Sequence, residues 1–139
     1  MSVPPVVFVC GRNSVRSPMA EALWRARFGS DALAVSCGVE PASYPDGFMI
    51  AVMAEDGADL SGFEPRGLDA VEAVSGALVV CLAAEAHDAA QGLAKRCAAR
   101  LEDWHLPDPV KVEGSREARL EAYRAIRDQL KAKIGAITQ

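Results

Sequence analysis

The sequence has no long hydrophobic run. The longest early apolar stretch extends from Val3 to Cys10, far less than the roughly 20 residues that a membrane-spanning helix needs. No basic segment precedes this stretch, as one would in a secretory signal peptide. We therefore expect a protein of the cytoplasm that has no membrane partner.

Positive charge is also scarce. The chain carries 15 Lys and Arg against 19 Asp and Glu, which gives a formal net charge of −4 and an isoelectric point near 5.2. A surface of this sign repels polyanions rather than attracting them. We expect no nucleic-acid partner.

Cysteine and histidine are few and widely spaced. The cysteines are Cys10, Cys37, Cys81 and Cys97. They form no Cys-x-x-Cys pair of the kind that holds zinc, and the last three lie in apolar or helical runs, so we expect reduced thiols. His87 and His105 are too isolated in the sequence to suggest a metal site, and we expect them at exposed helix and loop positions. We predict no metal and no cofactor.

The chain has the length and composition of one compact domain. Its 139 residues have a mass of 14.7 kDa, and 50% of them are hydrophobic and 24% charged. That composition is typical of a globular protein and argues against extended disorder or a coiled coil. We expect a single domain over residues 1–139.

Strand and helix patterns alternate along the chain. Strands are predicted at residues 4–9, 33–37, 77–82 and 99–104, and helices at 17–28, 48–54, 84–98 and 115–137. The last strand is the most polar and is expected at a sheet edge. This alternation predicts an α/β three-layer sandwich with parallel strands. Ligands of such sheets bind beyond the carboxyl ends of the strands, where Cys10 and residues 107–109 fall.

The segment Cys10-Gly-Arg-Asn-Ser-Val-Arg-Ser17 joins the first strand to a helix. Backbone N–H groups of such a loop can form an anion nest, the helix dipole adds positive potential, and Arg16 offers a planar fork for two phosphate oxygens. The same field favours the thiolate of Cys10, which makes this residue a candidate nucleophile. The candidate phosphate-binding residues are Gly11, Arg12, Asn13, Ser14, Val15, Arg16 and Ser17.

Simpler roles exist for three of these residues. Cys10 would then be a small buried side chain at the end of a strand. Ser17 is either the cap of the following helix or a hydrogen-bond partner of the thiolate. Asn13 either bridges the loop to itself or only fills a turn.

Residues 8–22 read Phe-Val-Cys-Gly-Arg-Asn-Ser-Val-Arg-Ser-Pro-Met-Ala-Glu-Ala. This stretch resembles the amino-terminal signature of the low-molecular-weight protein tyrosine phosphatases, Cys-x5-Arg-Ser followed by Pro-Met-Ala-Glu. Residues 36–39, 59–61, 78–82 and 108–109 resemble further segments of that family, so the resemblance spans nearly the whole chain.

The resemblance implies a four-stranded parallel sheet of order 2-1-3-4 and a phosphatase reaction. Cys10 would be the nucleophile, Arg16 would bind the phosphate, and Asp108 would protonate the leaving oxygen. The substrate would be a phosphorylated protein or a small aryl phosphate. The chemistry itself needs such an acid, which typically contributes ~10²–10⁴-fold. The alternative for Asp108 is a turn-forming residue between two prolines.

The sequence departs from the family pattern at three places. Arg12 replaces the usual glycine, and Val15 replaces the second loop cysteine of many members. Val110-Lys111 stands where the family has paired tyrosines, which puts tyrosine selectivity in doubt. Tyr44 or Phe48 could supply an aromatic wall instead.

Two other functions compete. Arsenate reductases are a sister group on the same scaffold, and residues 104–109 also resemble their Trp-x-x-x-Asp-Pro segment. In that case Cys81 and Cys97, or Cys37, would relay oxidation to a thioredoxin or glutaredoxin partner. No cysteine lies at residues 83–88, where the paired relay cysteines are expected, so we rank this activity second. The third alternative is a non-catalytic phosphoanion-binding module.

Overall fold

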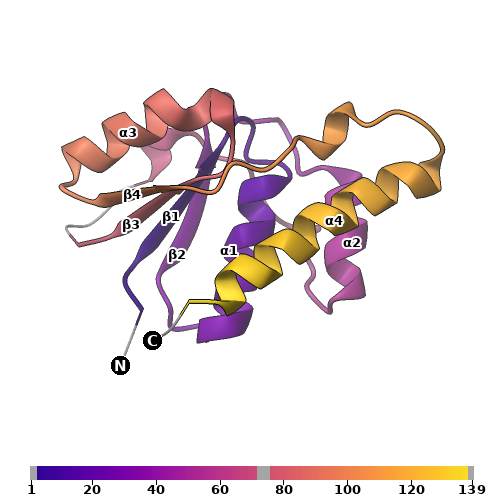
Figure 1. Ribbon diagram of the computed structural model, residues 1–139, viewed down its shortest axis with the longest axis horizontal. Coiled ribbons are helices and arrows are strands. Elements are labelled where there is room, and N and C mark those ends of the chain that lie inside the picture. Colours follow the sequence, from indigo (N-terminus) through magenta and orange to yellow (C-terminus); the bar gives the residue numbers. More distant parts are fainter. Residues whose placement is uncertain (1–2, 72–75, 138–139) are drawn as a thin grey trace.

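The computed structural model describes residues 3–71 and 76–137 (Figure 1). The strands are β1 (Val6–Cys10), β2 (Ala34–Gly38), β3 (Leu78–Cys81) and β4 (Arg100–Asp103). The α-helices are α1 (Arg16–Phe28), α2 (Gly47–Glu55), α3 (His87–Arg96) and α4 (Arg116–Gly135). The alternating order of strands and helices is the one predicted.

The four strands form one parallel sheet of order β2-β1-β3-β4. The predicted order is therefore confirmed, as is the edge position of the polar strand β4. Strand β1 is buried along its whole length and lies between β2 and β3. In the register of the sheet, Val9 of β1 pairs with Cys37 of β2 on one side and with Cys81 of β3 on the other.

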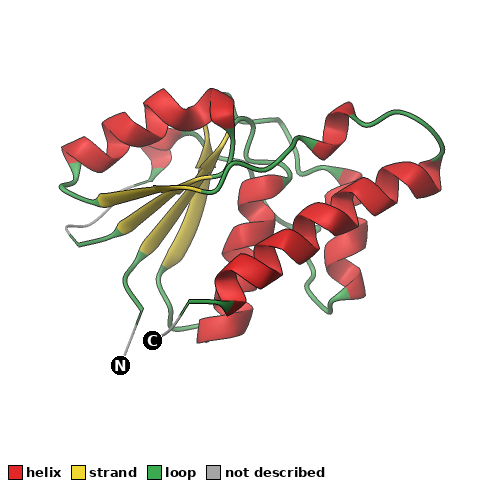
Figure 2. Cartoon of the chain, in the orientation of Figure 1, coloured by secondary structure: helices red, strands yellow, loops and turns green. Residues whose placement is uncertain are grey.

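Helices cover both faces of the sheet. Helix α1 packs on β1 and β2 and is itself covered by α4, which also contacts α2. Helix α3 packs on β3 and β4 from the other side, and Figure 2 shows the sheet between these two helical layers. The loops that follow the carboxyl ends of the strands gather at one edge of the sheet.

Two predicted helix starts need correction. The helix predicted at 84–98 is a 3-10 turn over Ala84–Ala86 followed by α3 (His87–Arg96). Helix α1 has Val15 at its N-cap position, and this side chain carries no polar atom. The capping role considered for Ser17 is therefore wrong, since Ser17 is the second residue of the helix and its hydroxyl is used elsewhere.

Aromatic packing fixes the segment that follows β4. The Phe8 ring lies 5.8 Å from Trp24 and 6.1 Å from Trp104, centroid to centroid. Phe8 is central in the sheet, and Trp104 directly follows β4, so this contact anchors the start of the loop that leads to Asp108. Trp104 thus packs against the core.

No helix of residues 3–71 or 76–137 is long and apolar enough to cross a membrane.

Candidate active site

The loop between β1 and α1 turns its carbonyl groups outward. The carbonyl oxygens of Cys10, Gly11, Arg12 and Ser14 accept hydrogen bonds from backbone N–H groups of Val39, Glu40, Ala42 and Asp46. These bonds are 2.8–3.1 Å long. In a planar trans peptide the N–H points opposite to the C=O, so the next N–H groups of the loop point inward. This arrangement is the anion nest that the sequence predicted.

The sulfur of Cys10 has two polar partners inside this loop. Ser17 Oγ lies 2.8 Å from Cys10 Sγ, and the backbone N–H of Asn13 donates to the same sulfur at 3.3 Å. Asn13 Nδ2 donates to Ser17 Oγ at 2.8 Å. Ser17 Oγ therefore accepts from an amide, and its own proton has two acceptors within reach, the Cys10 sulfur at 2.8 Å and the Cys37 carbonyl oxygen at 3.5 Å. The Ser17 hydroxyl and the Asn13 N–H thus both lie within hydrogen-bond distance of the Cys10 sulfur.

Asn13 bridges the loop to the rest of the fold. It is fully buried and takes a positive φ of 53°, which asparagine tolerates better than most residues. Its Nδ2 also donates to Ser36 Oγ at 3.0 Å, and its Oδ1 accepts from the backbone N–H of Arg66 at 2.8 Å. The predicted bridge of the loop to itself is confirmed by the bond from Asn13 to Ser17, and the bonds to Ser36 and Arg66 extend it beyond the loop.

Arg16 is almost fully buried at the start of α1, and its guanidinium is held from two sides. Nη1 donates to the carbonyl oxygen of Leu106 at 3.0 Å, and Nη2 donates to Glu85 Oε1 at 2.9 Å. Partial burial opposes ionisation of Glu85, but its own backbone N–H and the Arg16 guanidinium lower the pKa of this carboxyl below its usual range. Glu85 therefore competes, as a carboxylate, for the arginine that an oxyanion would use.

Asp108 has the turn-forming role that the sequence left open, and it also lines the cleft. Its Oδ1 accepts from the backbone N–H of Val110 at 3.1 Å and so shapes the turn. Its Oδ2 lies 4.0 Å from Arg16 Nη2 and faces the same cleft as Cys10. Oδ1 thus fixes the orientation of the carboxyl group, and Oδ2 is left on the side of the cleft.

These groups line a cleft of about 450 Å³. The lining residues are Cys10, Gly11, Arg12, Ser14, Val15, Arg16, Val39, Glu40, Glu85, Asp108, Val110 and Lys111. All the predicted site residues are brought together here, with Asn13 and Ser17 buried beneath the loop. Glu85, Val39, Glu40 and Lys111 were not among the predicted site residues, because no motif marks them in the sequence.

The aromatic walls proposed for the cleft are absent. Among the described residues, neither Tyr44 nor Phe48 lines it. Tyr44 is 74% exposed, and the Phe48 ring packs 5.4 Å from that of Tyr123. Phe48 therefore belongs to the contact between α2 and α4.

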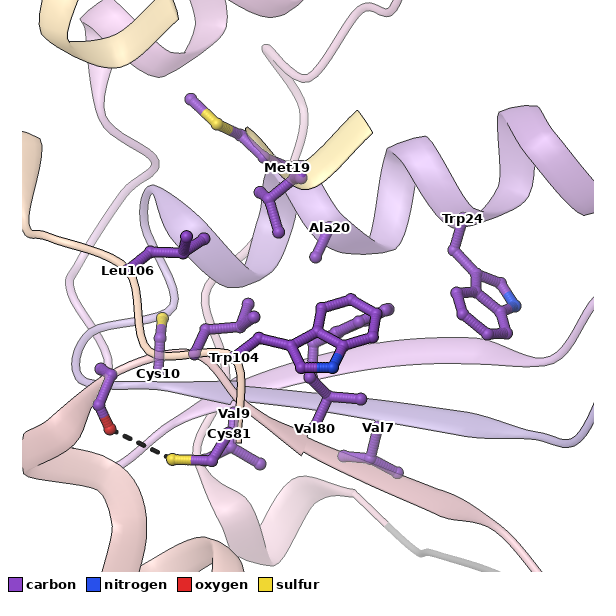
Figure 3. Close-up of a cluster of buried hydrophobic side chains, with 14 of the residues drawn as sticks. Val7, Val9, Cys10, Met19, Ala20, Trp24, Val80, Cys81, Trp104 and Leu106 are labelled. Atoms are coloured by element: carbon purple, nitrogen blue, oxygen red, sulfur yellow. Dashed lines mark hydrogen bonds between the residues drawn. The ribbon is translucent and has the colours of Figure 1, made fainter. Parts of the chain in front are cut away.

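The remaining cysteines do not face Cys10. Cys37 and Cys81 both pair with Val9 in the sheet, so their side chains point to the same face as that of Val9. Since successive side chains of a strand point to opposite faces, Cys10 points to the other face. Figure 3 shows Cys10 and Cys81 on the two sides of the sheet. Burial, with a further contribution from nearby Cys10, raises the pKa of Cys37 to about 12, and burial raises the pKa of Cys81 to about 11. Cys97 lies at the end of α3, in the far helical layer. None of the three is therefore placed as a relay thiol for Cys10.

The expected isolation of His87 and His105 is wrong. His87 Nδ1 and His105 Nε2 each lie 3.0 Å from the same atom, Asp103 Oδ1. The first histidine begins α3 and the second follows β4, and the packing of α3 on β4 closes the distance between them. Both side chains remain partly exposed, as expected.

The chain has counterparts among known proteins. The family model described as low molecular weight phosphotyrosine protein phosphatase matches residues 5–139. A protein named glutaredoxin arsenate reductase from Synechocystis is 32% identical over 139 residues, covering 93% of this chain and 92% of its own.

Solved structures share the fold of this chain. A structure described as an arsenate reductase in oxidized state has a TM-score of 0.75 and 29% identity, covering 95% of this chain and 94% of its own. The tyrosine phosphatase amsI of Erwinia amylovora has a TM-score of 0.74 and 18% identity, covering 96% of this chain and 89% of its own. At that identity the second likeness concerns the fold alone.

Proposed function

Since the chain belongs to the low molecular weight phosphotyrosine protein phosphatase family, we propose that it is a phosphomonoester hydrolase that works through a phosphocysteine on Cys10. One observation carries the proposal. Cys10, Arg16 and Asp108 line one cleft, the N–H groups of the loop point inward, and Arg16 Nη2 lies 4.0 Å from Asp108 Oδ2. That set supplies a nucleophile, an oxyanion site and an acid within one cleft.

The proposed reaction has two displacements at phosphorus. The Cys10 thiolate attacks the phosphorus, the S–P bond forms, and the bond to the leaving oxygen breaks while Asp108 gives this oxygen its proton. A water molecule then attacks the phosphocysteine, Asp108 takes its proton, and the S–P bond breaks to release phosphate and the thiolate. Arg16 and the loop N–H groups hold the phosphoryl oxygens throughout.

Substrate binding must move Glu85. Its carboxylate holds Nη2 of Arg16 at 2.9 Å, and a phosphate dianion needs the same donor. Two parallel hydrogen bonds from the guanidinium to phosphate are stronger than its single bond to a half-exposed carboxylate. We propose that the incoming phosphate displaces Glu85 toward solvent.

An aryl phosphate is the substrate class that we propose. Val39 and Val110 line the cleft, and their side chains are 43% and 48% exposed. Exposed apolar side chains beside a phosphate site favour an apolar group such as a phenyl ring, which loses water on binding. Lys111 and Arg12 on the same rim favour an anionic substrate such as an acidic phosphopeptide. The four free cysteines fit a reducing compartment, and we propose the cytoplasm.

Arsenate reduction is the second candidate, because relatives of this chain carry that name. Arsenate is a tetrahedral oxyanion of the same charge and would fit the loop. The subsequent reduction requires a second thiol to attack the adduct on Cys10. Cys37 and Cys81 lie on the opposite face of the sheet, so the reductant would have to come from thioredoxin or from a glutathione and glutaredoxin system.

The two activities are separated by one paired assay. Hydrolysis of p-nitrophenyl phosphate is measured with a metal chelator present, beside arsenate-dependent oxidation of thioredoxin or of glutathione with glutaredoxin. We expect nitrophenolate release by the wild type, none by Cys10→Ser, and no arsenate turnover. Arsenate turnover with weak hydrolysis would contradict the proposal, and phosphate binding with neither turnover would identify a non-catalytic module.

A further inference from the structure

A second cluster of reactive side chains lies away from the Cys10 cleft. It consists of Cys81, His87, Asp103 and His105, each of which offers one ligand atom, and these atoms all lie within 4.8 Å of one another. Its members come from the end of β3, the start of α3 and the end of β4. None of the four lines the Cys10 cleft.

The sheet and the helix fix the arrangement of the cluster. Cys81 and Asp103 are direct partners in the β3–β4 register, so both side chains project on the same face. The two imidazoles approach the same carboxylate oxygen, Asp103 Oδ1, at 3.0 Å each, with ring centroids 6.2 Å apart and planes at 87°. One sulfur, two ring nitrogens and one carboxylate oxygen therefore converge on one point.

We propose that this cluster is a binding site for one zinc-like divalent transition-metal ion. Cysteine, histidine and aspartate are ligands that zinc takes in tetrahedral sites. A thiolate with two imidazoles selects zinc or cobalt over magnesium and calcium, which prefer oxygen alone. The buried cysteine forms the floor, while the other three side chains are 38–42% exposed and leave a path for the ion.

The movement required for coordination is small. Bonds of about 2.0–2.3 Å place tetrahedral ligands roughly 3.3–3.8 Å apart. The four ligand atoms already lie within 4.8 Å, so closing the site takes about 1 Å. The exposed imidazoles can supply this shift by rotating about their side-chain bonds, while the strands hold Cys81 and Asp103. Coordination breaks the hydrogen bond from Cys81 Sγ to the Ala83 carbonyl oxygen and releases the thiol proton to water. It also replaces the hydrogen bonds of His87 Nδ1 and His105 Nε2 to Asp103, and each imidazole carries its proton on its other ring nitrogen once the ion is bound.

The site would link two segments that reach the Cys10 cleft. The chain from Cys81 to His87 carries Glu85, which bonds Arg16. The chain from Asp103 to His105 continues into Leu106, whose carbonyl oxygen accepts from the same guanidinium. A bound ion would hold both segments from the opposite side of the sheet, without being a reactant in the proposed hydrolysis.

The test uses the histidines as reporters, because the chain contains only these two. The full-length protein is purified without a histidine tag and in the Cys10→Ser form, so that the cleft thiol cannot bind the metal. Zinc is titrated by calorimetry and followed by the imidazole C–H signals in the NMR spectrum. We expect one zinc per chain, with both histidines shifting together, and no change with magnesium. Cobalt is expected to give a thiolate-to-cobalt absorption band.

Two substitutions decide the assignment. His105→Ala, at an exposed position, should weaken zinc binding by at least 10-fold. Asp88→Ala, an exposed acidic neighbour of His87 outside the cluster, should leave the affinity unchanged. Unmoved histidine signals, an affinity equal in His105→Ala, or zinc binding that disappears with Cys10→Ser would each overturn the proposal. None of these outcomes depends on phosphatase turnover.

Discussion

At the scale of single residues, Cys10 depends on groups that its own loop and helix supply. Ser17 lies 2.8 Å from the sulfur, and Asn13 fixes the hydroxyl by donating to its oxygen. The sequence shows that a serine follows Arg16, but it does not show the rotamer of this serine. The rotamer decides whether Ser17 caps the helix or contacts the sulfur. The N-cap position falls at Val15, which frees Ser17 for the sulfur.

Removal of the Ser17 hydroxyl should slow the attack of the Cys10 sulfur on its substrate. A hydrogen bond to a charged group contributes about 1.5–3 kcal/mol, so Ser17→Ala should lower kcat by roughly 10- to 100-fold. Alkylation of Cys10 by iodoacetate at neutral pH should slow in parallel. The matched control is Ser115→Ala, which removes the N-cap of α4 and should cost about 1 kcal/mol of stability while kcat stays unchanged. Equal kcat in both variants would leave Ser17 without a role in the reaction.

Asp108 should matter most when the leaving group is poor. Asn in its place keeps the turn-forming oxygen but cannot give up a proton, so Asp108→Asn should lower kcat on phenyl phosphate by ~10²–10⁴-fold. The loss on p-nitrophenyl phosphate, whose phenoxide is stable, should be smaller. Asp88→Asn, on the surface of α3, is the control. A loss of the same size on both substrates would indicate a positioning role only.

At the level of elements, the loop between β1 and α1 passes so close to the end of β2 that no side chain fits at Gly38. A Cβ built on Gly38 would lie 2.6 Å from the backbone nitrogen of Asn13 and 2.8 Å from the Arg12 carbonyl carbon. Both neighbours are backbone atoms of the anion loop, so only a glycine lets β2 approach it this closely. The sequence predicts a short strand that ends at Gly38, but it does not show that the loop after β1 packs against this glycine.

Gly38→Ala should therefore displace the loop. We expect a loss of about 1–3 kcal/mol in the free energy of unfolding, by chemical denaturation, together with weaker binding of inorganic phosphate. Gly47→Ala is the matched control, because nothing lies within 4 Å of a Cβ at Gly47, the first residue of α2. Its stability should stay within about 0.5 kcal/mol of the wild type. Phosphate affinity unchanged in Gly38→Ala would contradict this account of the loop.

Most elements could be predicted from the sequence, because their periodicities are unambiguous. The apolar runs that became β1 and β3 and the amphipathic stripe of α4 depend on local pattern alone. The contact of His87 and His105 with one carboxylate depends on tertiary packing. So does the hydrogen bond between Arg16 and Glu85, which are 69 residues apart in the sequence. The motif located the loop and its arginine, but the residues that line the rest of the cleft come from three other segments.

At the scale of the whole molecule, charged side chains join α2 to α4. Glu55 accepts from Arg124 and Arg127 at 2.8–3.1 Å, and Tyr123 donates to Asp46 at 2.9 Å. Hydrogen bonds from Arg124 and then Arg127 lower the pKa of Glu55 from its ordinary 4.5 to about 2. Since its pKa is depressed in the folded state, this contribution to stability is complete above pH 4.5 and is lost as the pH falls toward 2.

Glu55→Gln should make the free energy of unfolding less dependent on pH in this acidic range. We expect the wild type to lose more of its free energy of unfolding than the variant between pH 4.5 and the folded pKa near 2, measured by denaturant titrations across that range. Glu113→Gln, on the loop before α4, serves as the control and should follow the wild type. Parallel curves for wild type and Glu55→Gln would show that the helix contact is independent of this carboxylate.

The central claim is the covalent intermediate on Cys10, and trapping it is the most direct test. The protein is mixed with p-nitrophenyl phosphate, quenched in acid within the first turnovers, and examined by mass spectrometry of the intact chain and of its peptides. We expect the mass of one added phosphoryl group, located on Cys10, in wild type and none in Cys10→Ser. Nitrophenolate release at the wild-type rate by Cys10→Ser, or a phosphoryl group on another residue, would contradict it.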